Sequence, residues 1–203
     1  MISMMNIKDE IKKWLTSGSD SKEDVLDMVW SLKENNNLII AEHPKIPFVL
    51  YIFIDEKFVR LMANTEVDTA LLDPTERLDI YRKLLILNDR VNLVKYVISG
   101  TDEEIVLKAD LDQGTFSKDE FKEAIEGIIT SLYLMIKELN LEEEFNKMVN
   151  DRIVSMIQEK IKEGATESDL LLFLTKKVGL DKDSARKILD EIVKKEDYSE
   201  EYQ

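Results

Sequence analysis

Residues 74–110 carry the clearest pattern of apolar and polar positions in the chain. Asp73 and Pro74 predict a helix start, because Asp accepts hydrogen bonds from the free amides of a first turn and Pro needs no donor there. A helix of about four turns is expected to follow. Residues 93–98 are rich in β-branched and aromatic side chains, and residues 104–110 alternate apolar and polar positions. The pattern therefore predicts a helix followed by a two-stranded hairpin.

The chain before this stretch is predicted to contain two helices and three strands. Apolar residues at helical spacing indicate helices over residues 7–15 and from Ser21 to about Asn37. The strands are expected at residues 38–41, 48–54 and 58–63. The middle strand has no polar position, which is typical of a strand that is covered on both faces.

The chain after the hairpin is predicted to be helical. Ser117 and Glu120 have the spacing of a capping box, and a long apolar stripe follows them up to about residue 140. Three shorter helices are then expected at roughly 142–163, 167–178 and 182–195. We therefore predict an α+β fold in which an antiparallel sheet of about five strands has flanking helices in the order α-βββ-α-ββ-α. The expected domains are residues 1–140, with the N-terminal helices, and a C-terminal three-helix appendage over residues 141–203.

The charge of the chain limits the partners that it can attract. Lys and Arg number 28 against 42 Asp and Glu, a formal net charge of −14. The average field repels phosphate backbones, so nucleic acid is disfavoured as a partner. The chain has no cysteine, which excludes disulfides and thiolate chemistry. We see neither a membrane-spanning run nor a secretory signal, and we expect a cytoplasmic protein with no membrane association.

The order of predicted elements and four short segments resemble the type III secretion chaperone-like fold, which bacterial secretion chaperones share with the YbjN-like family. The segments are Leu84–Asn88, Lys95–Tyr96, Ile105–Asp110 and Phe116–Phe121. The resemblance covers about residues 21–140. It implies a small acidic dimer that binds another polypeptide through apolar patches and sheet edges, without a cofactor.

Three aromatic residues are candidates for contact with such a partner. Tyr51 and Phe53 lie in the wholly apolar strand, and a single sheet of this size can lack the helices needed to cover both of its faces. Trp30 is the third candidate, because exposed aromatic side chains are frequent at protein interfaces. Packing in a core is the competing interpretation for each of them.

Candidate catalytic and metal-binding residues are few. His43 is the only histidine and has no nucleophile or second ligand near it in the sequence, so a structural role is favoured. Asp110, Asp112, Gly114 and Glu120 suggest a calcium loop, but the turn glycine and the closing glutamate each fall one residue early. Glycine-rich phosphate loops and nucleophile elbows are missing from the sequence. We predict no enzyme activity, no metal site and no cofactor.

Two classes of function remain open. The first is a non-enzymatic, chaperone- or adaptor-like module that binds a polypeptide partner, expected to act as a homodimer. The alternative is a DNA-associated regulator that uses the helix pair over residues 166–195 as a helix-turn-helix, with Lys182, Arg186 and Lys187 on phosphates. Residues 166–203 hold seven Lys and Arg against ten Asp and Glu, a net charge of −3, whereas most DNA readers present a basic face.

Overall fold

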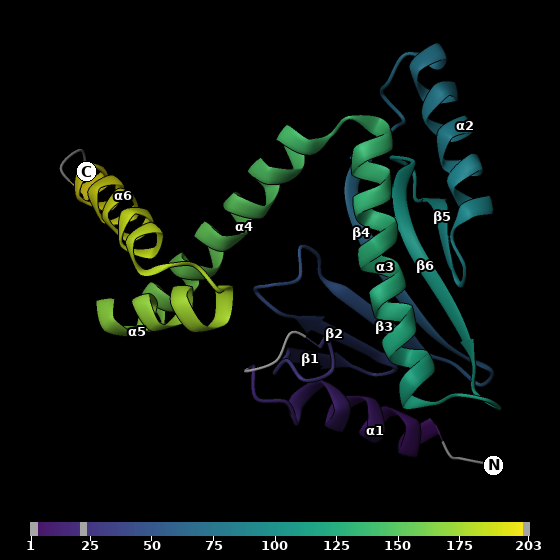
Figure 1. Ribbon diagram of the computed structural model, residues 1–203, viewed down its shortest axis with the longest axis horizontal. Helices are drawn as coiled ribbons and strands as arrows, with labels where there is room; N and C mark the ends of the chain where they lie inside the picture. Colours follow the sequence, from purple (N-terminus) through teal and green to yellow (C-terminus); the bar gives the residue numbers. More distant parts are fainter. Residues whose placement is uncertain (1–3, 21–23, 201–203) are drawn as a thin grey trace. The chain divides into compact units, whose positions relative to one another are not determined.

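The computed structural model describes residues 4–20 and 24–200 (Figure 1). The chain divides into two compact units, Met1–Glu142 and Glu143–Gln203. We call them the α+β unit and the helical unit.

The α+β unit is built on one antiparallel sheet of six strands. In chain order its elements are α1 (Met4–Thr16), β1 (Ser31–Asn35), β2 (Leu38–Glu42), β3 (Leu50–Ile54), β4 (Phe58–Asp68), α2 (Pro74–Arg90), β5 (Val94–Ser99), β6 (Glu104–Asp112) and α3 (Lys118–Leu139). The strands are ordered β1-β2-β3-β4-β6-β5 across the sheet. The predicted α+β class and antiparallel sheet are confirmed, with six strands in place of about five.

The core lies between one face of the sheet and the helices. A row of paired residues crosses this face from β2 to β5, and none of them is more than 1% exposed: Ile39, Ile52, Leu61, Ala109 and Val94. Helix α3 packs along β4, β5 and β6, and α2 packs on α3 and β5 (Figure 1). Helix α1 meets the start of α3, where the rings of Trp14 and Phe121 are 5.8 Å apart. Burial of this apolar surface is the main force that holds the unit together.

The helix expected from Ser21 to Asn37 is wrong in the residues that the structure describes. Residues 24–30 form a compact turn, and the next five residues form strand β1. The carboxylate of Asp24 accepts from the amide of Leu26, as in an Asx turn. Ser21, the expected start of the helix, lies outside the described residues. Asn36 adopts a φ of 49° in the tight turn to β2, a conformation that Asn tolerates better than most residues.

The expected cover on both faces of the apolar strand is also wrong. Leu50, Ile52 and Ile54 of β3 are buried, but Tyr51 is half-buried and the Phe53 side chain is 38% exposed. The helices of the α+β unit pack on the face that carries Ile52, which leaves the face with Tyr51 and Phe53 open.

The elements with strong capping and alternation signals form as predicted. The carboxylate of Asp73 accepts from the amide of Thr75 at 2.8 Å to start α2, and the hydroxyl of Ser117 accepts from the amide of Glu120 at 3.2 Å to start α3. Alternate residues of β6 face the core, since Ile105 and Leu107 are fully buried.

The helical unit contains α4 (Glu142–Lys162), α5 (Glu167–Leu172), a π-helical segment η1 (Phe173–Val178) that continues α5, and α6 (Lys182–Glu200). Thr166 and Asp169 form a reciprocal capping box at the start of α5. The core of this unit consists of Ile157, Leu170, Leu174, Ala185, Leu189 and Ile192. The predicted C-terminal helices are confirmed.

Candidate interaction surfaces

The open face of the sheet carries a continuous apolar surface. The antiparallel register pairs Tyr51 of β3 with Ile40 of β2 and with Met62 of β4, and it pairs Phe53 of β3 with Leu38 of β2. All five side chains are partly exposed, and Phe53 is the most exposed of them. Paired residues on one face have neighbouring side chains, so the five residues form one surface across β2, β3 and β4. We call it the open-face patch.

Of the three aromatic candidates from the sequence, two lie on this surface and one does not. Tyr51 and Phe53 lie in the open-face patch. Trp30 is only 2% exposed; its indole N–H donates to the carbonyl of Val25 at 2.8 Å, and its ring lies 6.0 Å from that of His43. The structure thus places Trp30 in the core of the α+β unit, away from any surface.

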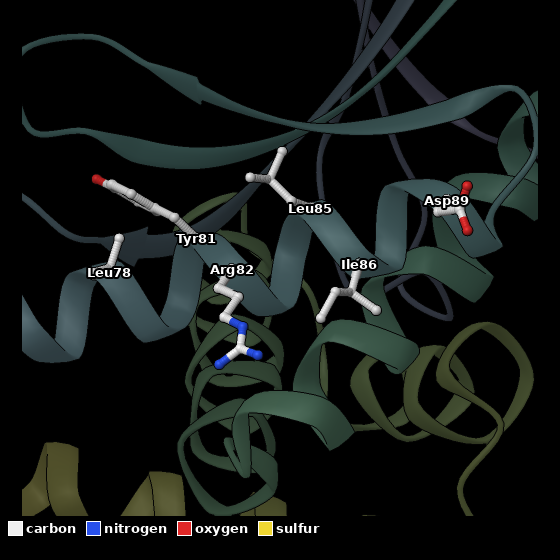
Figure 2. Close-up of a pocket in the computed structure, with 6 residues that line it drawn as sticks. All are labelled: Leu78, Tyr81, Arg82, Leu85, Ile86 and Asp89. Carbon is white, nitrogen blue, oxygen red and sulfur yellow. The ribbon is translucent and has the colours of Figure 1, made fainter.

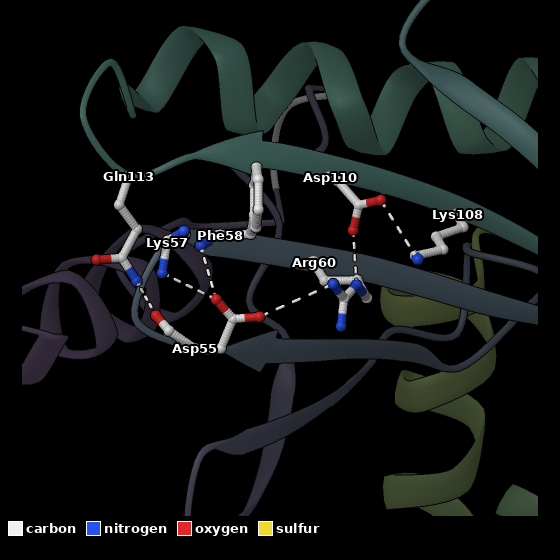
Figure 3. Close-up of polar contacts among 7 residues, drawn as sticks. All are labelled: Asp55, Lys57, Phe58, Arg60, Lys108, Asp110 and Gln113. Atoms are coloured by element: carbon white, nitrogen blue, oxygen red, sulfur yellow. Dashed lines mark hydrogen bonds and ion pairs between the residues drawn. The ribbon is translucent and has the colours of Figure 1, made fainter.

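A network of charged residues borders the open-face patch (Figure 3). The guanidinium of Arg60 donates to the carboxylate of Asp110 at 2.6 Å and lies 3.8 Å from that of Asp55, and the ammonium of Lys108 lies 3.3 Å from Asp110. Burial alone would raise the pKa of Asp110, but its hydrogen bonds with Arg60 and Lys108 lower that pKa below the usual value. The network joins β4 to β6 and neutralises charge beside the apolar surface.

The two edges of the sheet differ in their hydrogen bonding. At the β5 edge, the side-chain amide of Asn88 accepts from the backbone N–H of Tyr96 at 2.8 Å and donates to its carbonyl at 3.2 Å. The Tyr96 hydroxyl donates to the carbonyl of Ser131 at 2.6 Å, and burial raises its pKa to about 12. The β1 edge is more open, because four of its five residues are exposed. An exposed edge is a template for an added strand.

Helix α2 presents a second apolar surface, on its outer side. Leu78 is 68% exposed, Leu85 is 69% exposed and Ile86 is 45% exposed, although Leu84 and Leu87 of the same helix are buried. Together with Tyr81, Arg82 and Asp89 the three exposed residues line a shallow groove of about 570 Å³ (Figure 2). Sequence periodicity did not reveal this surface, because an apolar stripe does not tell which of its members a neighbouring element covers.

His43 and Asp112 of the candidate calcium loop both take part in structural hydrogen bonds. The Nδ1 atom of His43 accepts from the amide of Lys45 at 3.2 Å, its Nε2 lies 3.1 Å from the carboxylate of Asp20, and the side chain is fully buried. The carboxylate of Asp112 accepts from the amide of Gly114. Among the described residues, no group of three or more His, Asp or Glu side chains could hold a metal ion.

The end of the helical unit contains two helices joined by a short turn. The helix over residues 167–178 and α6 are joined by three residues, of which Gly179 has a φ of 91°. The carboxylate of Asp181 accepts from the amides of Asp183 and Ser184 and so caps α6. Lys182, Arg186 and Lys187 are exposed in the first two turns of α6.

Fold and surfaces together define a two-part protein, in which an α+β unit with one open sheet face precedes a helical unit of α4, α5 and α6. The chain belongs to the family described as a domain of unknown function, DUF8183, whose model matches residues 10–139. A second family model, HTH_78, also described as a domain of unknown function, matches residues 140–203. A search of curated proteins found no match.

Several solved structures are similar to this chain over about two thirds of its length, at low sequence identity. They include an uncharacterized protein from Methanothermobacter thermautotrophicus, with 14% identity, a TM-score of 0.48, and coverage of 66% of this chain and 96% of that one. The heterodimeric ExoU-SpcU complex of the type III secretion system of Pseudomonas aeruginosa matches with 15% identity, a TM-score of 0.40, and coverage of 63% and 96%. YbjN, a putative transcription regulator from E. coli, matches with 16% identity, a TM-score of 0.45, and coverage of 65% and 92%.

Both groups named by the sequence resemblance are therefore among the structural neighbours, and the likeness concerns the fold alone. Within residues 4–20 and 24–200, no helix combines the length and apolar character that crossing a membrane requires.

Proposed function

We propose that the α+β unit is a non-enzymatic module, chaperone- or adaptor-like, that binds a polypeptide partner and acts as a homodimer. The partner would lie on the open-face patch and add a strand at the β1 edge. The single observation that carries the proposal is the open-face patch itself, where Tyr51 and Phe53 stand beside Leu38, Ile40 and Met62 on three neighbouring strands. Contiguous exposed apolar surface of this kind marks interaction sites more often than chance exposure.

The two edges of the sheet support the same proposal. Asn88 already pairs with the outward backbone groups of Tyr96, so a strand added at β5 would have to displace its side chain. β1 is the other edge strand, and among the residues that the structure describes no strand pairs with its outer side, where a new strand could add. A partner that approaches there meets a chain of net charge −14, so segments that combine apolar and basic residues are favoured.

The test is a comparison of what full-length variants retain from a lysate of the source organism, with nuclease present and salt near physiological. The wild type, a Tyr51→Glu/Phe53→Glu double variant and a Leu172→Glu control are immobilised in parallel. Leu172 is 59% exposed on α5, so the control introduces a glutamate, with one negative charge against two in the double variant, at an apolar surface position of the helical unit.

A polypeptide that the wild type and the control retain at near-equal stoichiometry, and that the double variant loses, supports the proposal. Equal retention by all three variants contradicts it. Circular dichroism of each variant checks that the introduced charges leave the fold intact.

A second candidate function is DNA binding by the helical unit. The three-residue turn with Gly179 supports it, and the family model that matches residues 140–203 carries helix-turn-helix in its name. Lys182, Arg186 and Lys187 on α6 would contact phosphates, against the net charge of −3 over residues 166–203.

Binding of labelled duplex DNA, measured as a function of salt, tests this candidate. A steep fall in affinity with salt that an Arg186→Glu/Lys187→Glu variant abolishes would support it. Binding that is undetectable at low salt, or that the variant leaves unchanged, would rule it out.

A further inference from the structure

The outer side of α2 is an exposed apolar surface that also carries one cationic side chain, Arg82, and one anionic side chain, Asp89. Leu85 and Ile86 lie at its centre, and Leu78 extends it toward the start of the helix. Figure 2 shows Leu78 and Leu85 on one side of the helix and Arg82 and Ile86 on the other. Neither Arg82 nor Asp89 forms an ion pair within the part of the chain that the structure describes.

The positions of these residues are self-complementary under a two-fold axis. Arg82 precedes the midpoint between Leu85 and Ile86 by three and a half residues, and Asp89 follows that midpoint by the same interval. At a rise of 1.5 Å per residue, each charge lies about 5 Å along the helix from the midpoint. A second copy of α2, packed antiparallel about this midpoint, would bring each Arg82 opposite an Asp89 of the other copy.

The same register satisfies the apolar residues. In such a pair, a side chain on one flank of the contact faces the side chain on the same flank of the second copy. Leu85 therefore meets Leu85 of the second copy, and Ile86 meets Ile86. An isologous contact requires this kind of match, because both copies use one surface. We propose that the outer side of α2 is the face through which two copies of this chain associate, with two Arg82–Asp89 ion pairs setting the antiparallel register.

Helix α2 is held in place before any such contact forms. The Tyr81 hydroxyl donates to the carboxylate of Glu103 at 2.7 Å, and Arg77 lies 3.1 Å from the same carboxylate. Asn88 fixes the other end of the helix to β5. The exposed side chains therefore stand on a rigid helix, so association would cost little backbone ordering.

This inference rests on the homodimer in the proposed function, and it specifies the face. Sedimentation equilibrium of the full-length chain at several protein concentrations measures the dimer dissociation constant. The buffer contains about 0.15 M salt, which is close to physiological ionic strength. The variants are Arg82→Asp, Asp89→Arg, the double variant with both changes, Leu85→Glu, and Leu172→Glu as a control outside α2. Leu85 is 69% exposed, so its substitution leaves the fold of the monomer intact.

We expect each single charge reversal to raise the dissociation constant about tenfold, because two attractive pairs become repulsive, and the double variant to return it to within about threefold of the wild type. Leu85→Glu should give monomers at all concentrations, and the control should match the wild type. If all α2 variants dimerise with the dissociation constant of the wild type, α2 is not the dimer face, although the chain is still a homodimer. A wild-type chain that stays monomeric overturns both.

Discussion

The pairing of Asn88 with Tyr96 gives the most specific prediction for the stability of the α+β unit. One side-chain amide replaces the missing neighbour of an edge strand, with hydrogen bonds of 2.8 Å and 3.2 Å to the two backbone groups of one residue. Tyr96 is only 6% exposed, so water replaces these bonds poorly when the amide is removed. Asn88→Ala should therefore lower the free energy of unfolding by roughly 2–3 kcal/mol, about 1–1.5 kcal/mol for each bond lost.

Urea unfolding followed by tryptophan fluorescence measures this change in the right part of the chain. Both tryptophans, Trp14 and Trp30, belong to the α+β unit, so the signal does not depend on the helical unit. The control is Asn92→Ala, because Asn92 is exposed and its side chain makes no hydrogen bond with the residues that the structure describes. The slope of the free energy against urea concentration should be equal in all three proteins.

A loss below about 0.5 kcal/mol for Asn88→Ala, or a loss equal to that of the control, would refute the reasoning, since surface substitutions without partners fall in that range. The variant should also aggregate faster during refolding, because it uncovers the edge of β5.

Two further predictions concern charge and backbone conformation. The pKa of Asp110 is lowered in the folded state, so its contribution to stability is present above its unfolded-state pKa and is lost as the pH falls through the folded-state pKa. The difference in the free energy of unfolding between the wild type and Asp110→Asn should therefore be largest near neutral pH and become smaller in acid. Urea unfolding at several pH values measures this difference. Gly179 has a φ of 91°, so Gly179→Ala should destabilise the helical unit by about 1 kcal/mol or more in thermal unfolding followed by circular dichroism, and an unchanged transition would contradict the strained turn.

The sequence predicted the elements whose ends carry their own signals. Asp73 and Ser117 cap their helices as expected, because a cap is a local interaction between residues two or three positions apart. The β6 strand was recognisable because Ile105, Leu107 and Ala109 are buried on one face, whereas Lys108 and Asp110 are partly exposed on the other, although Val106 on that second face is buried as well.

The prediction of a helix over the segment from Asp24 to Asn36 was wrong because this segment carries no local signal that is specific to one structure. A carboxylate that can cap a helix can also close an Asx turn, and apolar residues three or four apart can pack in a compact turn as well as on a helix face. Only tertiary contacts decide between the two structures, such as the bond from the Trp30 amide to the carbonyl of Leu15 in α1.

The candidate surfaces were predictable only in part. The absence of polar residues in β3 drew attention to Tyr51 and Phe53, and the structure places both on the open face. Trp30 has the same kind of side chain, but its surroundings come from distant segments and bury it. The outer side of α2 could not be identified from spacing, since Leu78 and Leu85 are exposed and Leu84 is buried within one apolar helix.

Photo-crosslinking from position 53 tests the central claim most directly. Phe53 is replaced in the full-length chain by a photoreactive phenylalanine analogue, the protein is irradiated in lysate of the source organism, and the products are identified by mass spectrometry. The same analogue at Leu172, exposed in the helical unit, serves as the control. The proposal predicts a polypeptide partner crosslinked at position 53 and not at 172. Crosslinks at position 53 only to the chain's own residues, or the same products from both positions, would contradict a partner-binding open face.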